Sequence, residues 1–75
     1  MNAPKKTRSV KLGGSYYVER LCKKLVETSS WFAVEPLPDN EWEVYYKPER
    51  HPTVRQFMKE HLTPTFFQKW ERSNP

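Results

Sequence analysis

The sequence predicts a small α+β domain, a two-layer sandwich with a small antiparallel sheet and two helices on one face. Two segments carry apolar residues at positions i, i+3, i+4, i+7 and i+8, the pattern of an amphipathic helix. Between them, residues 31–47 contain two short aromatic and β-branched stretches separated by turn residues, which predicts an antiparallel hairpin. Packing both helices on the same face of the sheet would bury both apolar stripes.

The 75 residues are enough for one domain, whose small core depends on a few large side chains. Residues 1–7 are basic, show no periodicity and include a proline, so they are expected to form a disordered arm. Residues 8–72 are expected to form the single α+β domain. Residues 73–75 are expected to be a disordered tail.

The first strand and the first helix follow the arm. Residues 8–12 alternate between polar and apolar side chains, which predicts a short half-buried strand that Gly13 and Gly14 end. Ser15 fits the N-cap of a helix over residues 16–29, because its hydroxyl can accept a backbone N–H of the first turn. The apolar face of this helix would carry Val18, Leu21, Cys22, Leu25 and Val26.

The hairpin consists of two predicted strands, residues 31–35 and residues 41–47, which are joined by a turn rich in proline, aspartate and asparagine. Pro36 and Pro48 cannot donate a hydrogen bond to a neighbouring strand, so we expect them to mark strand ends. In the second strand one face would carry Trp42, Val44 and Tyr46, while the other carries Glu41, Glu43, Tyr45 and Lys47.

The second helix is expected over residues 53–62, with Thr53 and Gln56 forming a capping box at its start. Pro64 ends this helix and is also favoured at the first position of a new one, so a short third helix is expected. A fourth strand over residues 65–70 is the alternative. The predicted core contains Leu21, Leu25, Val34, Trp42, Val44, Phe57 and Leu62.

Two partial resemblances follow from this order of elements. The whole chain resembles an incomplete ferredoxin-like fold, in which residues 65–70 would supply the missing strand. Residues 8–27, a strand followed by an amphipathic helix, resemble the start of the ribbon–helix–helix DNA-binding proteins. The hairpin stands where that family has its second helix, and no specific motif supports membership of either group.

No pattern in the sequence predicts a catalytic, metal or cofactor site, and we expect a protein that is not an enzyme. Cys22 falls on the apolar face of the first helix, where a small buried side chain is expected rather than a reactive thiol. His61 is expected to be half-buried in the core, and His51 to be solvated in a loop. Glu41 and Glu43 lie on an exposed strand face, which does not desolvate either carboxyl group as acid catalysis requires.

The charge distribution favours binding of DNA or RNA by a small regulatory module of a bacterial or phage kind. The net charge is +4, and four of the 13 basic residues lie in residues 1–12, which contain no acidic residue. Basic arms of this kind often bind nucleic acid, and phosphate contacts release counterions. The predicted phosphate-binding residues are those of the arm and of one face of the first helix: Lys5, Lys6, Arg8, Lys11, Arg20, Lys23 and Lys24.

A protein partner is the alternative, in the role of an inhibitor, adaptor or small subunit. The hairpin is acidic and would repel phosphates, so the molecule is expected to be bipolar, which suits a protein partner or a homodimer. Tyr45, Phe66 and Trp70 are the residues expected at a protein interface, because aromatic side chains anchor such surfaces. A single cysteine, the absence of a signal-peptide pattern and the absence of an apolar run long enough for a bilayer predict a cytoplasmic protein without membrane contact.

Overall fold

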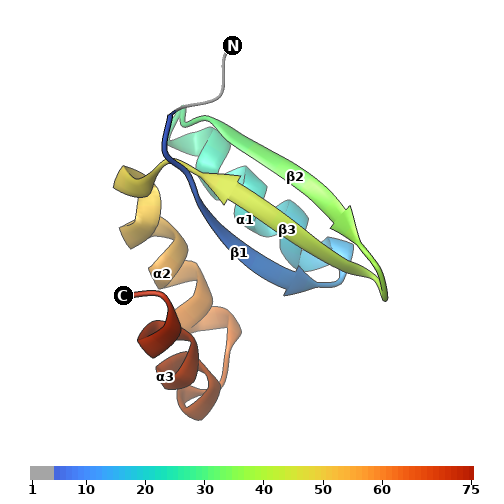
Figure 1. Ribbon diagram of the computed structural model, residues 1–75, viewed down its shortest axis with the longest axis vertical. Helices are drawn as coiled ribbons and strands as arrows, with labels where there is room; N and C mark the ends of the chain where they lie inside the picture. The colour runs from blue at the N-terminus through green and yellow to red at the C-terminus, as the bar shows by residue number, and fades with distance from the viewer. Residues whose placement is uncertain (1–4) are drawn as a thin grey trace.

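The computed structural model describes residues 5–75, which form one antiparallel sheet in the order β1-β3-β2 and three α-helices (Figure 1). The strands are β1 (Arg8–Gly13), β2 (Phe32–Leu37) and β3 (Glu41–Tyr46). The helices are α1 (Ser15–Glu27), α2 (His51–His61) and α3 (Pro64–Ser73), with a 3-10 turn, Pro48–Arg50, directly before α2. The predicted α+β class is confirmed, and the last segment is a helix rather than a fourth strand.

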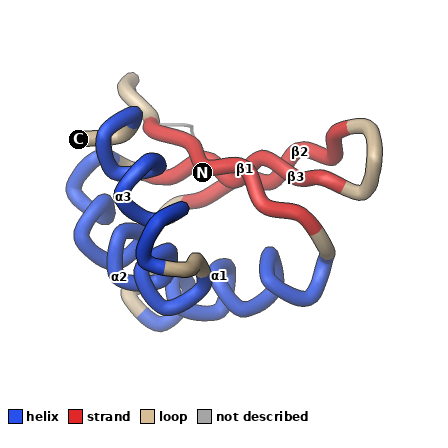
Figure 2. Tube along the Cα trace, turned by 90° about the horizontal axis from the view of Figure 1, so that it is seen from below, coloured by secondary structure: helices blue, strands red, loops and turns tan. Residues whose placement is uncertain are grey.

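The sheet has β3 at its centre, although β3 is the last strand in the sequence. β3 pairs in antiparallel register with both outer strands, so that Val44 lies opposite Val10 on one side and opposite Val34 on the other. Figure 2 shows α1 and α2 on one side of the sheet, while neither of them covers the other face, which we call the uncovered face. The C-terminal end of α3 reaches the outer edge of β1, where Trp70 and Ser9 line the same hollow.

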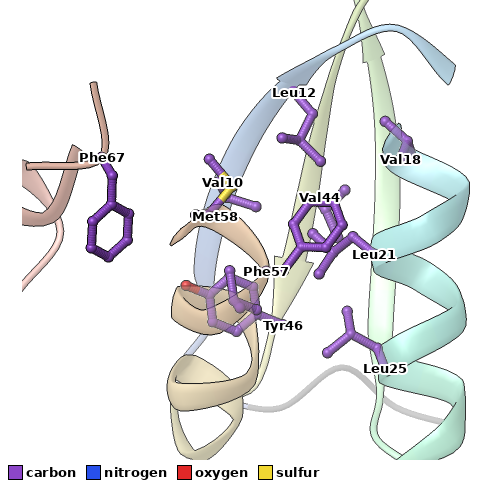
Figure 3. Close-up of a cluster of buried hydrophobic side chains, with 11 residues drawn as sticks. Val10, Leu12, Val18, Leu21, Leu25, Val44, Tyr46, Phe57, Met58 and Phe67 are labelled. Carbon is purple, nitrogen blue, oxygen red and sulfur yellow. The ribbon is translucent and has the colours of Figure 1, made fainter. Parts of the chain in front are cut away.

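The core lies between the sheet and the first two helices (Figure 3). The even-numbered residues of β1 and β3 point towards the helices, because successive side chains in a strand alternate between its two faces. Figure 3 shows Phe67 of α3 to one side of the main cluster. The buried side chains are Val10, Leu12, Val18, Leu21, Leu25, Val44, Tyr46, Val54, Phe57, Met58 and Phe67.

The turn of the hairpin is held against the start of α1. Asp39 and Asn40 have φ angles of 63° and 58°, a left-handed conformation that short polar side chains tolerate. The backbone N–H of Gly14 donates to the carbonyl oxygen of Asn40 over 3.0 Å. Gly14 itself has a φ of 89°, which an L-residue with a side chain rarely adopts. The glycine therefore allows the chain to turn sharply from β1 into α1 beside the hairpin turn.

Both predicted helix caps are wrong. Gly14 occupies the N-cap position of α1, Ser15 is its first helical residue, and no side chain caps this end. At α2 the 3-10 turn runs directly into the helix, which therefore begins at His51, two residues before the predicted N-cap Thr53. Thr53 then lies inside the first turn and cannot act as the cap.

The edge position of β2 explains two further differences from the prediction. Val34 points to the helix side as expected, but it is 39% exposed because β2 is an outer strand that the helices cover poorly. The expectation that Val34 is buried is therefore wrong. Trp42 and Leu62 are half-buried and pack against the core. Pro36 lies inside β2 rather than after it, which an edge strand permits.

The predicted disordered arm falls partly outside the described residues, because the structure begins at Lys5. Lys5, Lys6 and Thr7 are exposed and belong to no helix or strand. At the other end of the chain, α3 continues to Ser73, and the side-chain amide of Asn74 donates to the carbonyl oxygen of Trp70 over 2.9 Å.

Candidate functional site

The start of β1, the end of β3 and the end of α1 meet at one end of the molecule. Arg8 lies opposite Tyr46 in the sheet, so that Lys47 follows at the same end. Arg50, in the 3-10 turn, donates from Nη2 to the carbonyl oxygen of Thr28 over 3.4 Å. Segments that are far apart in the sequence therefore bring their basic side chains to one end of the sheet, the end at which β1 begins in Figure 1.

Six basic residues make up this basic end: Lys5, Lys6, Arg8, Lys24, Lys47 and Arg50. Lys24 belongs to it because it lines a hollow between the last turn of α1 and the start of α2, together with Glu27, Thr28 and Pro52. Within the part of the chain that the structure describes, the single ion pair joins Arg55 to Glu71 over 2.6 Å. None of the six is therefore neutralised by a direct ion pair, and Glu27 and Glu49 are the acidic residues nearest in sequence.

The opposite end of the sheet is acidic. Asp39 and Glu41 lie at the hairpin turn, and Glu35 and Glu43 lie on the uncovered face of the sheet. Glu43 accepts a hydrogen bond from the hydroxyl of Ser9 over 2.7 Å. We call Glu35, Asp39, Glu41 and Glu43 the acidic hairpin. The acidic hairpin and the start of β1 thus lie towards opposite ends of the sheet, and Lys11 lies opposite Glu43 between them.

The seven predicted phosphate-binding residues do not form one patch. Arg8 and Lys11 point to opposite faces of β1, because an odd number of positions separates them. Lys11 lies opposite Glu43 on the uncovered face, away from α1. The guanidinium group of Arg20 lies 5.7 Å from the centre of the Tyr16 ring, near the end of α1 that adjoins the hairpin turn. Lys23 is exposed and points away from the core.

Lys47 and Arg50 are residues that the sequence analysis missed. Their neighbours in sequence are mostly acidic or apolar, so the segment as a whole suggests an acidic surface. The signal that would have identified Lys47 is the strand register, because pairing β1 with β3 places it next to Arg8. That register depends on which strand is central, and strand order is not visible in the alternation of residues.

The residues predicted at a protein interface lie on different surfaces. Tyr45 is half-buried on the uncovered face of the sheet, where partial burial and the neighbouring carboxylates of Glu43 and Glu35 raise the pKa of its phenol. Phe66 is 60% exposed on α3. Trp70 is half-buried and packs against the core, with its ring 5.9 Å from that of Phe67.

The two histidines and the cysteine are partly buried, and each histidine contacts an aromatic residue of another element. His51 is the first residue of α2 rather than a solvated loop residue, and its Nδ1 lies 3.0 Å from the hydroxyl of Tyr46. His61 is half-buried and lies 4.3 Å, between ring centres, from Tyr17 of α1. Burial and the nearby Glu19 raise the pKa of the Cys22 thiol, which disfavours the reactive thiolate.

The hollows described on the surface of residues 5–75 are open to solvent. The hollow between α1 and α2 has a volume of about 200 Å³ and is lined by Tyr17, Arg20, Phe57, Glu60 and His61. Residues 5–75 contain no group of three or more histidine, cysteine, aspartate or glutamate side chains placed to hold a metal ion. What the structure offers instead is a pair of oppositely charged ends and an uncovered sheet face.

Comparison with known proteins supplies no further assignment. Among the helices of residues 5–75, none is long and apolar enough to cross a membrane. The chain matches no protein-family model, and no curated protein and no solved structure is significantly similar to it.

Proposed function

We propose that this protein binds nucleic acid through its basic end. The observation that carries the proposal is the convergence of six basic residues from the arm, α1 and the segment after β3, none of which forms an ion pair within residues 5–75. Phosphates that contact such a surface release condensed counterions, which gives salt-dependent affinity. The acidic hairpin at the other end repels phosphates, so the molecule would approach the nucleic acid end-on.

Aromatic side chains beside the basic end favour contact with unpaired bases as well as with phosphates. Trp31 and Phe32 are half-buried at the start of β2, and Phe32 lies opposite Tyr46 in the sheet. Bases stack on aromatic rings without regard to sequence, and a single strand lets its bases reach a ring. The proposal therefore includes single-stranded DNA or RNA beside duplex DNA as ligands.

The test measures binding of labelled duplex and single-stranded oligonucleotides by fluorescence anisotropy at several salt concentrations. A triple variant, Lys5→Gln, Lys6→Gln and Lys47→Gln, removes three charges from the basic end without touching the core. The matched control, Lys11→Gln, Lys59→Gln and Lys69→Gln, removes three charges elsewhere and has the same net charge.

The basic-end triple variant should bind more weakly, because it engages fewer phosphates. Its log–log salt slope should fall by about 0.9 for each duplex phosphate that it no longer binds, and by about 0.7 for each phosphate of a single strand. The control should keep the slope of the unchanged protein. Equal weakening of both triple variants would mean that net charge alone drives binding. Absence of binding by the unchanged protein at about 50 mM salt would refute the proposal.

A protein partner is the second candidate, and the uncovered face of the sheet is the observation that favours it. This face carries Glu35, Glu41, Glu43 and Tyr45, and α1 and α2 leave it open to solvent (Figure 2). A basic protein surface would complement it. Binding there should be abolished in Glu35→Gln with Glu41→Gln and should be unchanged in the lysine triple variant of the basic end.

A further inference from the structure

The sheet has two outer edges. Within the described residues, the outer edge of β2 is covered by neither a strand nor a helix. The sheet ends in β1 on one side and β2 on the other. Trp70 of α3 and Asn74, which follows α3, lie beside the edge of β1, where they share a hollow with Ser9 and Lys11. In Figure 1, β2 lies on the side of the sheet away from α2 and α3. An uncovered edge presents backbone groups that can pair with another strand.

The hydrogen bond at Gly14 shows which backbone groups face that edge. The Gly14 N–H donates to Asn40 over 3.0 Å and extends the β1–β3 register by one pair. Hydrogen-bonded and non-hydrogen-bonded pairs alternate in an antiparallel ladder. The pair of Leu12 with Trp42 is therefore hydrogen-bonded, and Trp42, like Val44 two positions on, directs its backbone groups to β1.

The intervening residues of β3, such as Glu43, consequently direct their backbone groups to β2. Their partners, such as Glu35, are bonded within the sheet. Phe32, Val34 and Pro36 then turn their backbone groups outward to the open edge. Pro36 lacks an N–H. Because this position faces the outer edge, the missing donor removes no hydrogen bond between β2 and β3.

We propose that β2 pairs with β2 of a second copy, antiparallel and about a two-fold axis at Val34, to give a continuous six-stranded sheet. The outward N–H and C=O of Val34 bond those of the second copy's Val34. The N–H of Phe32 donates to the outward carbonyl of the second copy's Pro36. The missing donor of Pro36 shortens this ladder, so the dimer is weak. It is also self-limiting, because a two-fold interface uses the same edge of both copies.

Apolar side chains beside the edge would be removed from water by a second copy, which favours the pairing. Val34 is 39% exposed on the helix side of β2. Val26 of α1 is 59% exposed, and it lies about 160° around the helix from Lys24, the residue that faces α2. Val26 is therefore on the flank of α1 that faces away from α2. Pairing at Val34 places the second copy beside this flank of the sheet and of α1, so both valines become covered.

Charge complementarity selects the second copy as the partner. Phe32 begins β2 at the basic end, and Leu37 ends it at the acidic hairpin. Antiparallel pairing therefore places the basic end of each copy beside the acidic hairpin of the other. With the axis at Val34, Glu35 faces the second copy's Ala33, so two glutamates do not meet across the axis.

Sedimentation equilibrium of the full chain without nucleic acid tests the proposal, which makes the result independent of the proposed function. The mass should rise from 9.0 kDa towards twice that value as the concentration approaches about 1 mM. Val34→Lys places two like charges at the axis and should raise the dimer dissociation constant about tenfold or more. The matched control, Phe66→Lys, makes the same exposed-apolar-to-lysine change on α3 and should leave the constant unchanged.

Amide hydrogen exchange identifies the edge. At low concentration the N–H groups of Ala33 and Glu35 should be protected and those of Phe32 and Val34 should exchange rapidly. At high concentration Phe32 and Val34 should become protected as well. A protein that stays at 9.0 kDa throughout overturns the proposal. A dimer that Phe66→Lys disrupts, or one without new protection at Val34, overturns it equally.

Discussion

The hydroxyl of Tyr46 lies 3.0 Å from Nδ1 of His51, and the two rings are nearly parallel with centres 6.2 Å apart. Trp70 lies 5.9 Å from the same imidazole ring. His51 thus joins the central strand, the start of α2 and the last turns of α3. Because Tyr46 is only 1% exposed, its polar group needs this partner.

Replacing Tyr46 by phenylalanine should lower the free energy of unfolding by about 1 kcal/mol or more, because the hydrogen bond is removed and His51 keeps an unpaired ring nitrogen. Urea denaturation measures the change. Tyr45→Phe is the control: its hydroxyl lies on the uncovered face, and the change should stay within about 0.5 kcal/mol. Equal effects of the two variants would show that the bond to His51 contributes nothing.

Stability should fall between about pH 7.5 and about pH 5, because both histidines are less basic when folded. Burial and the nearby Arg8 lower the pKa of His51; Arg55 also lowers it, while Asn74 and Glu71 oppose the shift. Burial and Arg20 lower the pKa of His61. A lowered folded pKa means that the unfolded chain binds protons first, so this contribution is complete above about pH 6.5 and is lost below it.

Urea midpoints at the two pH values measure this dependence. The double variant His51→Gln and His61→Gln should lose less stability on acidification than the unchanged protein, and each single variant should fall between them. The carboxylates give the same background in all four proteins. If the double variant lost as much as the unchanged protein, the histidines would not be the source.

Leu25→Ala should cost about 2 to 5 kcal/mol, because Leu25 is completely buried between α1 and the sheet. The neighbouring Val26→Ala removes a side chain that is 59% exposed and should cost about 0.5 kcal/mol or less. Chemical denaturation of the two variants compares adjacent positions on one helix. A cost below about 1 kcal/mol at Leu25 would mean that α1 packs by another face.

Phe67 and Phe66 should differ in the same way on α3. Phe67 is 8% exposed and Phe66 is 60% exposed. Phe67→Ala should cost about 3 kcal/mol or more, unless α3 undocks first and limits the loss to its own packing. Phe66→Ala should be nearly neutral. Near-ultraviolet circular dichroism of the aromatic residues follows the docking of α3, and a neutral Phe67→Ala would contradict the packing described.

The amphipathic patterns were sufficient to predict the elements, because a helix or strand needs only its own residues to establish its period. Val18, Leu21 and Leu25 recur at helical spacing and are buried, and Val44 and Tyr46 alternate and are buried. The caps could not be predicted, since the 3-10 turn that starts α2 early depends on how the chain leaves β3.

The candidate site was predicted only in part, because it depends on strand order. The arm lysines were identified from their sequence, and they do lie near Arg8. Lys47 joins them only because β1 pairs with β3, and Val34 is exposed only because β2 is outermost. The alternation of polar and apolar residues within a strand does not indicate which strands pair or which strand is outermost.

The central position of β3 also determines when the sheet can form during synthesis. β1 and β2 run in the same direction, separated by β3, and each pairs with β3. A nascent chain that stops before Glu41 therefore contains both outer strands and α1 but no strand that joins them. The hairpin of β2 and β3 closes over a few residues, whereas β1 must close a loop that includes all of α1 and β2, which costs more chain entropy. β1 is therefore synthesised first but cannot pair until β3, the last strand, has been synthesised.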